Sequence, residues 1–300
     1  MSAHHRIGTD VAPARGLARV ITLPAPSPGF IGDGHTAIHV IESQDFSDND
    51  PFILLADDRI DLPRGQPAGG PHPHAGFEIV TFVVEGSLRD RDEGLLHAGD
   101  VVWTTTGSGL VHSEDVEPLG RTRILQLWVT SPSTLRWVEP RFRHLSRDRV
   151  PVRRHPGSEA RVYSGTSGSI DAGRHLNLPL TMVDVALEPH AAFDQVIPAD
   201  HSAFLYPLEG DLIADGLSPQ RLAVGQIGWV EDGDGASANA LRVTAGASGA
   251  RVVLFTGQRQ GVAIVTHGPF VGESRADLIR LGLAYSGGSM PRISELPSAR

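Results

Sequence analysis

The chain contains no cysteine among its 300 residues. Disulfide bonds, thiolate metal ligands and cysteine nucleophiles are therefore excluded. It also has no excess of basic residues, because 26 lysines and arginines stand against 35 aspartates and glutamates, for a formal net charge of −9. A protein that binds nucleic acid regardless of sequence needs a basic surface. Direct nucleic-acid binding is therefore not expected.

Long apolar runs are absent as well. No segment approaches the roughly 20 apolar residues of a membrane-spanning helix, and the N-terminal stretch holds no run resembling a secretory signal core. With 40% hydrophobic and 20% charged residues, the composition is that of a soluble globular protein. Its length allows two ordinary domains or one large one, with sizeable cores. We expect a cytoplasmic monomer without membrane contact.

Short apolar segments separated by turn residues run through most of the chain. Residues 79–84 (IVTFVV) are β-branched and apolar on both faces, which predicts a buried strand. Glycine-rich turns recur at the spacing of a β-sandwich or barrel, so the fold class is predicted to be all-β. One helix is predicted near residues 274–286, because Ser274 and Asp277 can form a capping box and Gly287 can end it.

An internal repeat predicts two copies of one β unit. Residues 82–86 (FVVEG) recur 124 positions later as 206–210 (YPLEG). Residues 99–103 (GDVVW) recur 126 positions later as 225–229 (GQIGW). The N-terminal domain, a connector, and the C-terminal domain with the helix are expected at 1–135, 136–154 and 155–300.

Two pairs of metal-capable side chains occur in the first copy, His72 with His74 and His112 with Glu114. Alternate residues of a strand leave the same face, so two neighbouring strands would bring three imidazoles and a carboxylate together. Such ligands favour a first-row divalent metal, and an octahedral ion would keep two positions open for substrate and dioxygen. Zinc would more often be four-coordinate, which favours a structural or hydrolytic site. Glu114 could also accept a proton from a substrate hydroxyl.

Two further observations bear on this site. Glu78 shares the strand parity of His74, so it could replace Glu114 as a ligand or orient one from outside. The repeat offsets carry the four candidate ligands onto residues that cannot ligate through their side chains: Val196, Pro198, Ala238 and Ala240. The second copy is therefore expected to lack a metal. A lone histidine is more often a packed side chain, but the paired pattern within a β repeat favours the metal interpretation.

These residues resemble the pirin family of the cupin superfamily. The first cupin motif is recognisable in His72-x-His74-x3-Glu78-x7-Gly86. The phrases typical of pirins are PHPH at 71–74 with GFE at 76–78, GxGxxHSE at 107–114, LQLWV at 125–129 and GPFV at 268–271. The resemblance implies a bicupin of two facing β-barrel (jelly-roll) domains with metal only in the first. Its implied ligands are His72, His74, His112 and Glu114. Iron(II) is favoured, with nickel, cobalt, manganese, copper or zinc as alternatives.

The resemblance also implies what the protein does. Bacterial relatives include enzymes similar to quercetin 2,3-dioxygenase, which open a flavonol with O2, and the matching catalytic residue here is Glu114. Animal members resemble redox-sensitive co-regulators that act through protein partners. We therefore expect an iron-dependent dioxygenase acting on a flavonol or similar enolic phenol. The alternatives are a metal- or redox-sensing regulatory protein with a protein partner, and a metal that only braces the barrel. Ala75, Thr105 and Ser108 replace an arginine, a methionine and an arginine common in the family, which makes the site entrance less positive.

Overall fold

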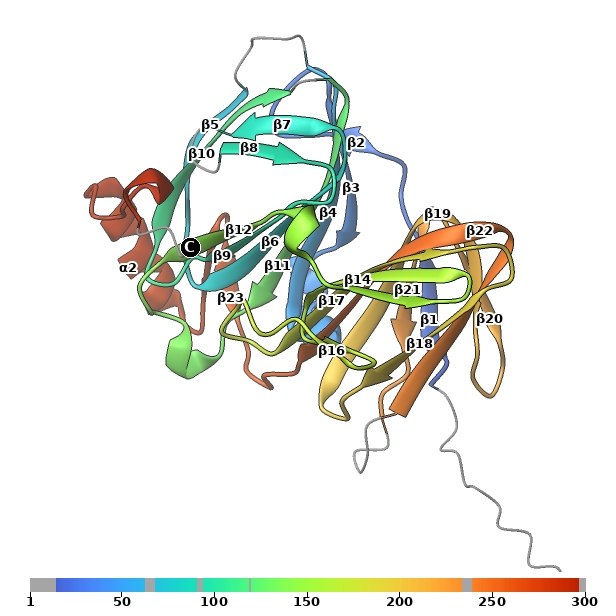
Figure 1. The fold of residues 1–300 in the computed structure, drawn as a ribbon. Coiled ribbons are helices and arrows are strands. Elements are labelled where there is room, and N and C mark those ends of the chain that lie inside the picture. The colour runs from blue at the N-terminus through green and yellow to red at the C-terminus, as the bar shows by residue number, and fades with distance from the viewer. Residues whose placement is uncertain (1–14, 63–67, 91–93, 119, 234–238, 297–300) are drawn as a thin grey trace, which may run out of the picture.

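The computed structural model describes residues 15–62, 68–90, 94–118, 120–233 and 239–296, without the side chains of residues 68, 69, 90 and 113–118. Strands dominate the described chain and form two halves, each built on a large antiparallel sheet (Figure 1). This arrangement confirms the prediction of an all-β bicupin.

The N-terminal half contains two sheets among its described residues. The larger has the order β12-β9-β6-β11-β4-β3-β2, and the smaller has the order β5-β10-β7-β8. The strands of the larger sheet are β2 (Ser27–Pro28), β3 (His35–Ile41), β4 (Phe52–Ile60), β6 (Phe77–Glu85), β9 (Val101–Thr105), β11 (Thr122–Thr130) and β12 (Arg141–Leu145). Those of the smaller sheet are β5 (Ala68–His74), β7 (Ser87–Asp90), β8 (Gly94–His97) and β10 (Leu110–Pro118).

The C-terminal half contains one extensive sheet with the main order β1-β21-β19-β22-β17-β14-β13, to which β18 and β20 add. Its strands are β1 (Leu17–Thr22), β13 (Val152–His155), β14 (Ser158–Ser164), β17 (Leu180–Leu187), β18 (Ala192–Ile197), β19 (His201–Ala214), β20 (Gln220–Ala223), β21 (Gln226–Val230) and β22 (Asn239–Gln258). Two small hairpins complete the described strands: β15 (Thr166–Ser167) with β16 (Ile170–Asp171), and β23 (Val265–His267) with β24 (Phe270–Gly272).

Helical segments are short and peripheral. The described helices are α1 (Phe46–Asn49) and α2 (Arg275–Ser286), with 3-10 turns η1 (Ser43–Asp45), η2 (Ser133–Leu135), η3 (Arg147–Arg149) and η4 (Ile293–Glu295). Ser274 and Asp277 form the predicted capping box of α2, and Gly287 is its C-cap. Within the described ranges, no helix has both the length and the apolar character needed to span a membrane.

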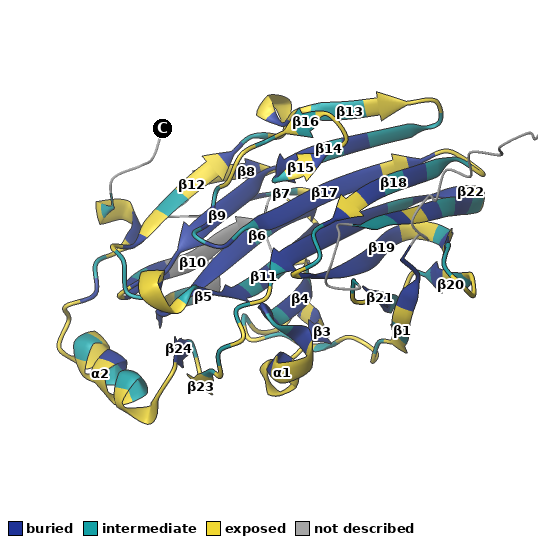
Figure 2. Cartoon of the chain, turned by 90° about the horizontal axis from the view of Figure 1, so that it is seen from below, coloured by how far each residue is buried: buried dark blue, intermediate teal, exposed yellow. Residues whose placement is uncertain are grey.

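The largest hydrophobic cluster lies between the two large sheets. It contains apolar side chains from both halves, and the central strands are buried along most of their length (Figure 2). Phe52 of the N-terminal half packs edge-on against Phe204 of the C-terminal half, with ring centroids 4.8 Å apart. Burial of apolar surface is the main favourable term in domain association. The two halves therefore share a core.

The internal repeat predicted from the sequence corresponds to equivalent backbone pairing. Val80 lies opposite Trp103 in the first copy, and Phe204 lies opposite Trp229 in the second. Gly86 and Gly210 end the repeated segments with φ values of +78° and +67°. Residues that carry a side chain rarely adopt such positive φ values. A Cβ atom at either glycine would also overlap a backbone carbonyl oxygen, of Arg121 and Gly249 respectively.

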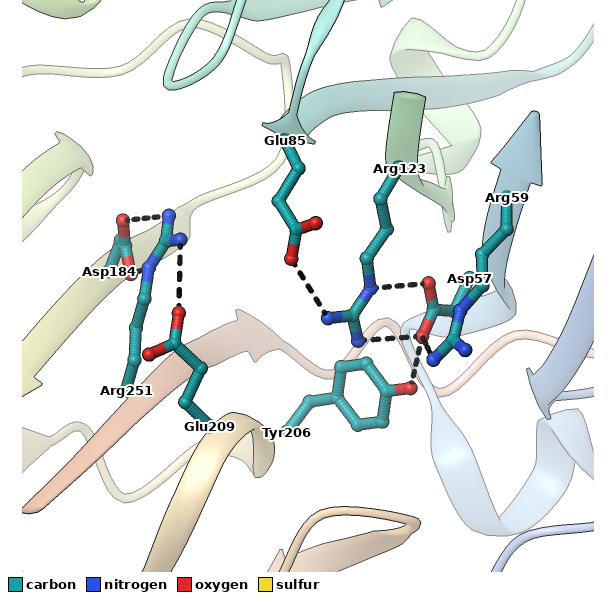
Figure 3. A network of polar contacts seen from close by, with 8 residues as sticks. All are labelled: Asp57, Arg59, Glu85, Arg123, Asp184, Tyr206, Glu209 and Arg251. Carbon is teal, nitrogen blue, oxygen red and sulfur yellow. Dashed lines mark hydrogen bonds and ion pairs between the residues drawn. The ribbon is translucent and has the colours of Figure 1, made fainter. Parts of the chain in front are cut away.

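A polar cluster is duplicated along with the strands (Figure 3). Arg123 donates two hydrogen bonds of 2.9 and 2.8 Å to Asp57, and Arg251 donates two of 3.1 and 2.9 Å to Asp184. A glutamate from the repeated Glu-Gly dipeptide completes each cluster, Glu85 at 3.7 Å from Arg123 and Glu209 at 4.0 Å from Arg251. The repeat thus preserves ion pairs as well as turns.

Two segments outside the repeat copies, one near the start of the chain and one in the expected connector, form strands of the large sheets. Strand β1 pairs with β21, so a segment near the start of the chain belongs to the C-terminal sheet. Strand β12, inside the expected connector, pairs with β9 of the N-terminal sheet. The boundaries at 135 and 155 remain a prediction.

Candidate metal centre

Two strands bring the predicted histidines together. In the antiparallel pair of β5 and β10, His72 lies directly opposite His112, and His74 lies two residues further along β5. Pro71 and Pro73 alternate with the histidines, and β5 is an edge strand of its sheet. An edge strand tolerates proline because its outer N–H groups need no ladder partner. The sequence PHPH therefore forms a stiff extended segment that presents both imidazoles on one face.

The three imidazoles form a compact group. Their ring centroids lie 4.8 Å apart for His72 and His74, 4.6 Å for His72 and His112, and 5.3 Å for His74 and His112. One nitrogen from each ring lies within 4.8 Å of the other two. In the described part of the chain, this is the group whose side chains are arranged to hold a metal ion.

His74 is the most deeply buried of the three. Its side chain is in the interior, and neither ring nitrogen has a hydrogen-bond partner among the described residues. Desolvation lowers the pKa of His74 well below 6.5, and repulsion from His112 and His72 lowers it further. The ring is therefore neutral and carries a free lone pair. A buried polar group without a partner requires an explanation, and a bound metal supplies one.

His72 is oriented by the backbone of its own strand. Its Nδ1 lies 3.0 Å from the carbonyl oxygen of Gly70, to which it can donate a hydrogen bond. In that tautomer Nε2 carries the lone pair. Metal-binding histidines characteristically donate their second nitrogen to a carbonyl or carboxylate in this way. The donor set thus fits a first-row divalent metal.

The two candidate carboxylate ligands, Glu114 and Glu78, lie at different places relative to the histidines. Glu114 belongs to β10, where its backbone pairs with Gly70, but its side chain lies outside the described residues. Glu78 does not join the histidines. Its carboxylate accepts hydrogen bonds from the Thr105 hydroxyl at 2.9 Å and the Asn177 N–H at 3.3 Å.

The proposed ligand role of Glu78 fails because Gly76 interrupts the strand. Gly76 has φ +88° and separates β5 from β6, so strand parity counted from His74 does not continue to residue 78. Glu78 instead faces the C-terminal half, where it is fully buried. Desolvation raises the pKa of its carboxyl above 4.5, against the opposing effect of its hydrogen bonds.

Aromatic side chains surround the histidines, and sequence reasoning missed them as site residues. The rings of Phe77 and Trp128 lie 5.6 and 5.4 Å from that of His74 and 4.4 Å from each other. The exposed ring of Phe30 lies 6.1 Å from that of His72. We call Phe77 and Trp128 the aromatic wall. A usable signal was available for Trp128, because it shares strand parity with Gln126, the one polar residue in the run 124–129.

In the second copy, the positions related by the repeat to the candidate ligands hold residues whose side chains cannot bind a metal. Val196 pairs with Ala240 between β18 and β22, Pro198 follows β18, and Ala238 lies outside the described residues. The interior of this half is packed with apolar side chains such as Phe193 and Leu241.

Comparison with known proteins decides the family. The Pirin family model matches residues 36–129, and the model of the Pirin C-terminal cupin domain matches residues 182–290. The chain belongs to the pirin family. Its two pirin segments coincide with the two repeat copies, and the histidine group lies in the first.

The similarity to relatives in the pirin family covers most of the chain. A pirin-like protein of Caulobacter vibrioides is 34% identical over 248 residues, covering 77% of this chain and 84% of its own length. A Pseudomonas aeruginosa protein that carries the provisional name quercetin 2,3-dioxygenase is 31% identical over 272 residues, covering 86% and 93%. A solved structure from Geobacillus kaustophilus, 32% identical, covers 84% of this chain and 100% of its own, with a TM-score of 0.76.

Proposed function

We propose that this pirin-family protein is a metal-dependent dioxygenase that opens a flavonol or a similar enolic phenol, as a quercetin 2,3-dioxygenase does. The observation that carries the proposal is the group of three imidazoles with the buried, unpartnered His74 beside an aromatic wall. The name of the Pseudomonas relative supports the same reaction class.

The ligands in this proposal are His72, His74, His112 and Glu114. The three imidazoles come from the described site, and Glu114 is assigned from its place two residues after His112 on the same strand. Iron(II) is the favoured ion, with nickel, cobalt, manganese, copper and zinc as alternatives, because nitrogen and oxygen ligands without sulfur suit first-row divalent metals. Such an ion would supply Lewis acidity and the redox chemistry that dioxygen requires.

The chain's own residues would bind the substrate and move its proton. Trp128 of the aromatic wall is only partly buried and offers ring surface on which a planar phenol can pack, and the buried Phe77 supports it from the interior. Because the His74 ring is neutral, it contributes no positive charge to the site. The metal would therefore supply the positive charge that stabilises an anionic enolate oxygen of the substrate. Glu114 would accept the proton from the substrate hydroxyl, which leaves the ring carbon electron-rich and reactive toward O2.

The test is the loss of quercetin absorbance in air. Protein loaded anaerobically with iron(II) is expected to consume quercetin and O2 together, and the His112→Ala variant is expected to be inactive. Absence of turnover with iron, nickel, cobalt and manganese would contradict the flavonol reaction.

A substitution in the aromatic wall tests how substrate binds. Trp128→Leu removes ring surface while leaving every proposed ligand in place. We expect KM for quercetin to rise more than kcat falls, because the lost contact serves binding before and during the reaction alike. An unchanged KM would show that Trp128 does not contact the substrate.

A further inference from the structure

The last part of the chain returns from the C-terminal half to the N-terminal half. We call residues 269–293 the C-terminal clamp; they include β24 and α2 and end at η4. Figure 1 shows the red end of the chain beside β10 and β12, away from the C-terminal sheet that precedes it. The clamp therefore contacts the half of the molecule that carries the histidines.

The clamp hydrogen-bonds the strand of His74 at the next residue. The N–H of Ala75 donates to the carbonyl oxygen of Pro269 at 3.3 Å, and the N–H of Val271 donates to the carbonyl oxygen of Ala75 at 3.0 Å. A Cβ atom at Gly76 would overlap the carbonyl oxygen of Val271, so glycine is needed for this close approach. The backbone that follows His74 is thus held by two hydrogen bonds to the clamp.

It also hydrogen-bonds the strand of His112 at the preceding residue. The N–H of Val111 donates to the carbonyl oxygen of Pro291 at 2.8 Å, and Val111 forms a parallel bridge with Arg292. A Cβ atom at Gly109 would lie 2.7 Å from the Cε of Met290. Both strands that carry the candidate ligands are therefore fixed at positions adjacent to a ligand.

Side chains join these two contacts into one unit. Met290 packs in a cluster with Ala75, Phe270 and Leu281, and Val111 packs against that cluster. Arg136, which is fully buried, donates to the carbonyl oxygen of Gly76 at 2.7 Å and contacts Glu273 of the clamp at 2.9 Å. A movement of the clamp would consequently shift both histidine-bearing strands.

We infer that the C-terminal clamp positions His74 and His112, so that metal affinity at the N-terminal site depends on a segment that follows the second cupin domain. This inference rests on the proposed metal site. Groups that orient metal ligands from outside typically change affinity by about 10–100-fold when they are removed. Met290 shares a cluster with Ala75, which follows His74, and lies beside Gly109, which precedes β10, and it is a positioning residue.

Cobalt(II) affinity, measured by competition with a chromogenic chelator, tests the inference. Met290→Ala is expected to weaken cobalt binding about 10-fold or more and to alter the visible spectrum of the bound cobalt. Met290→Leu, which conserves volume, is expected to restore both. The matched control is Met182→Ala, which removes a fully buried methionine from the core between the halves. It should lower thermal stability without changing cobalt affinity.

The outcomes separate the two proposals. Equal cobalt affinity in the Met290→Ala and Met182→Ala variants, with tight binding by the unmodified protein, would overturn the clamp but leave the metal site intact. Absence of cobalt binding by the unmodified protein would contradict the metal site itself, and the clamp's role with it.

Amide hydrogen exchange in the unmodified protein provides a measurement that needs no variant. Because coupling is reciprocal, cobalt is expected to slow exchange of the Ala75 and Val111 amides. The Val162 amide, bonded to the Pro151 carbonyl oxygen at 3.0 Å in the C-terminal half, serves as the control and should not respond. Unchanged exchange at Ala75 and Val111 would overturn the inference.

Discussion

The phenol of Tyr206 donates a hydrogen bond of 2.7 Å to the carboxylate of Asp57, across the boundary between the two halves (Figure 3). Asp57 is fully buried and already accepts two hydrogen bonds from Arg123. The first copy has Phe82 at the position that repeats as Tyr206, so this bond has no counterpart from the repeat. The bond from Tyr206 to Asp57 therefore breaks the symmetry of the repeat, because Phe82 has no hydroxyl group with which to form its equivalent.

Removal of the Tyr206 hydroxyl should weaken the contact between the halves. Tyr206→Phe is expected to lower the free energy of unfolding by about 1.5–3 kcal/mol, the range for a hydrogen bond to a charged group. The matched control is Tyr163→Phe, because the Tyr163 hydroxyl donates to the neutral Gly99 carbonyl oxygen, also at 2.7 Å. Chemical denaturation should show the larger loss for Tyr206→Phe. The reverse order would contradict the assigned role of the Asp57 charge.

The buried carboxyl of Glu78 should make stability depend on pH. Its folded-state pKa is raised above 4.5, so the folded protein holds this proton more tightly than the unfolded chain does. The resulting stabilisation is fully present below pH 4.5 and is lost as pH rises through the raised folded pKa. Glu78→Gln should therefore gain stability relative to the unmodified protein as pH rises through this window. Parallel stability profiles from pH 4.5 to 8 would show that the Glu78 proton is not linked to folding.

The repeated Glu-Gly turns should tolerate no side chain at the glycine. Gly86→Ala combines a positive φ, worth about 1–3 kcal/mol of strain, with overlap on the Arg121 carbonyl oxygen. Gly173 has a similar φ of +76°, but no atom lies within 4 Å of the place its Cβ would take, so Gly173→Ala isolates the conformational part. Thermal unfolding should show a greater loss for Gly86→Ala, and equal losses would refute the steric explanation.

The features that depend on residues close together in the chain could be predicted from the sequence. Strand alternation predicted that His72 and His74 share a face, and the motif order placed His112 nearby; the structure brings all three together. The repeat predicted two β units because turns with positive φ, such as Gly86 and Gly210, require a particular residue. Capping chemistry likewise located α2 to within a residue.

Long-range pairing was beyond the reach of the same reasoning. Nothing in the local pattern of β1 indicates that it joins β21, or that Val111 bonds to Pro291, because these contacts depend on how complete domains pack. The parity argument for Glu78 failed at one residue, Gly76, whose positive φ changes the strand direction. Local periodicity holds only as far as the strand is continuous.

We propose that His72, His74, His112 and Glu114 bind one metal ion, and elemental analysis of the purified protein is the direct test. Protein purified without added metal should contain a first-row transition metal in stoichiometric amount, with iron favoured over nickel, cobalt, manganese, copper and zinc. The His112→Ala variant, purified in parallel and folded by circular dichroism, should contain none. A metal-free native protein that takes up none of these ions, or a variant that retains the full metal content, would contradict a metal site at these four residues.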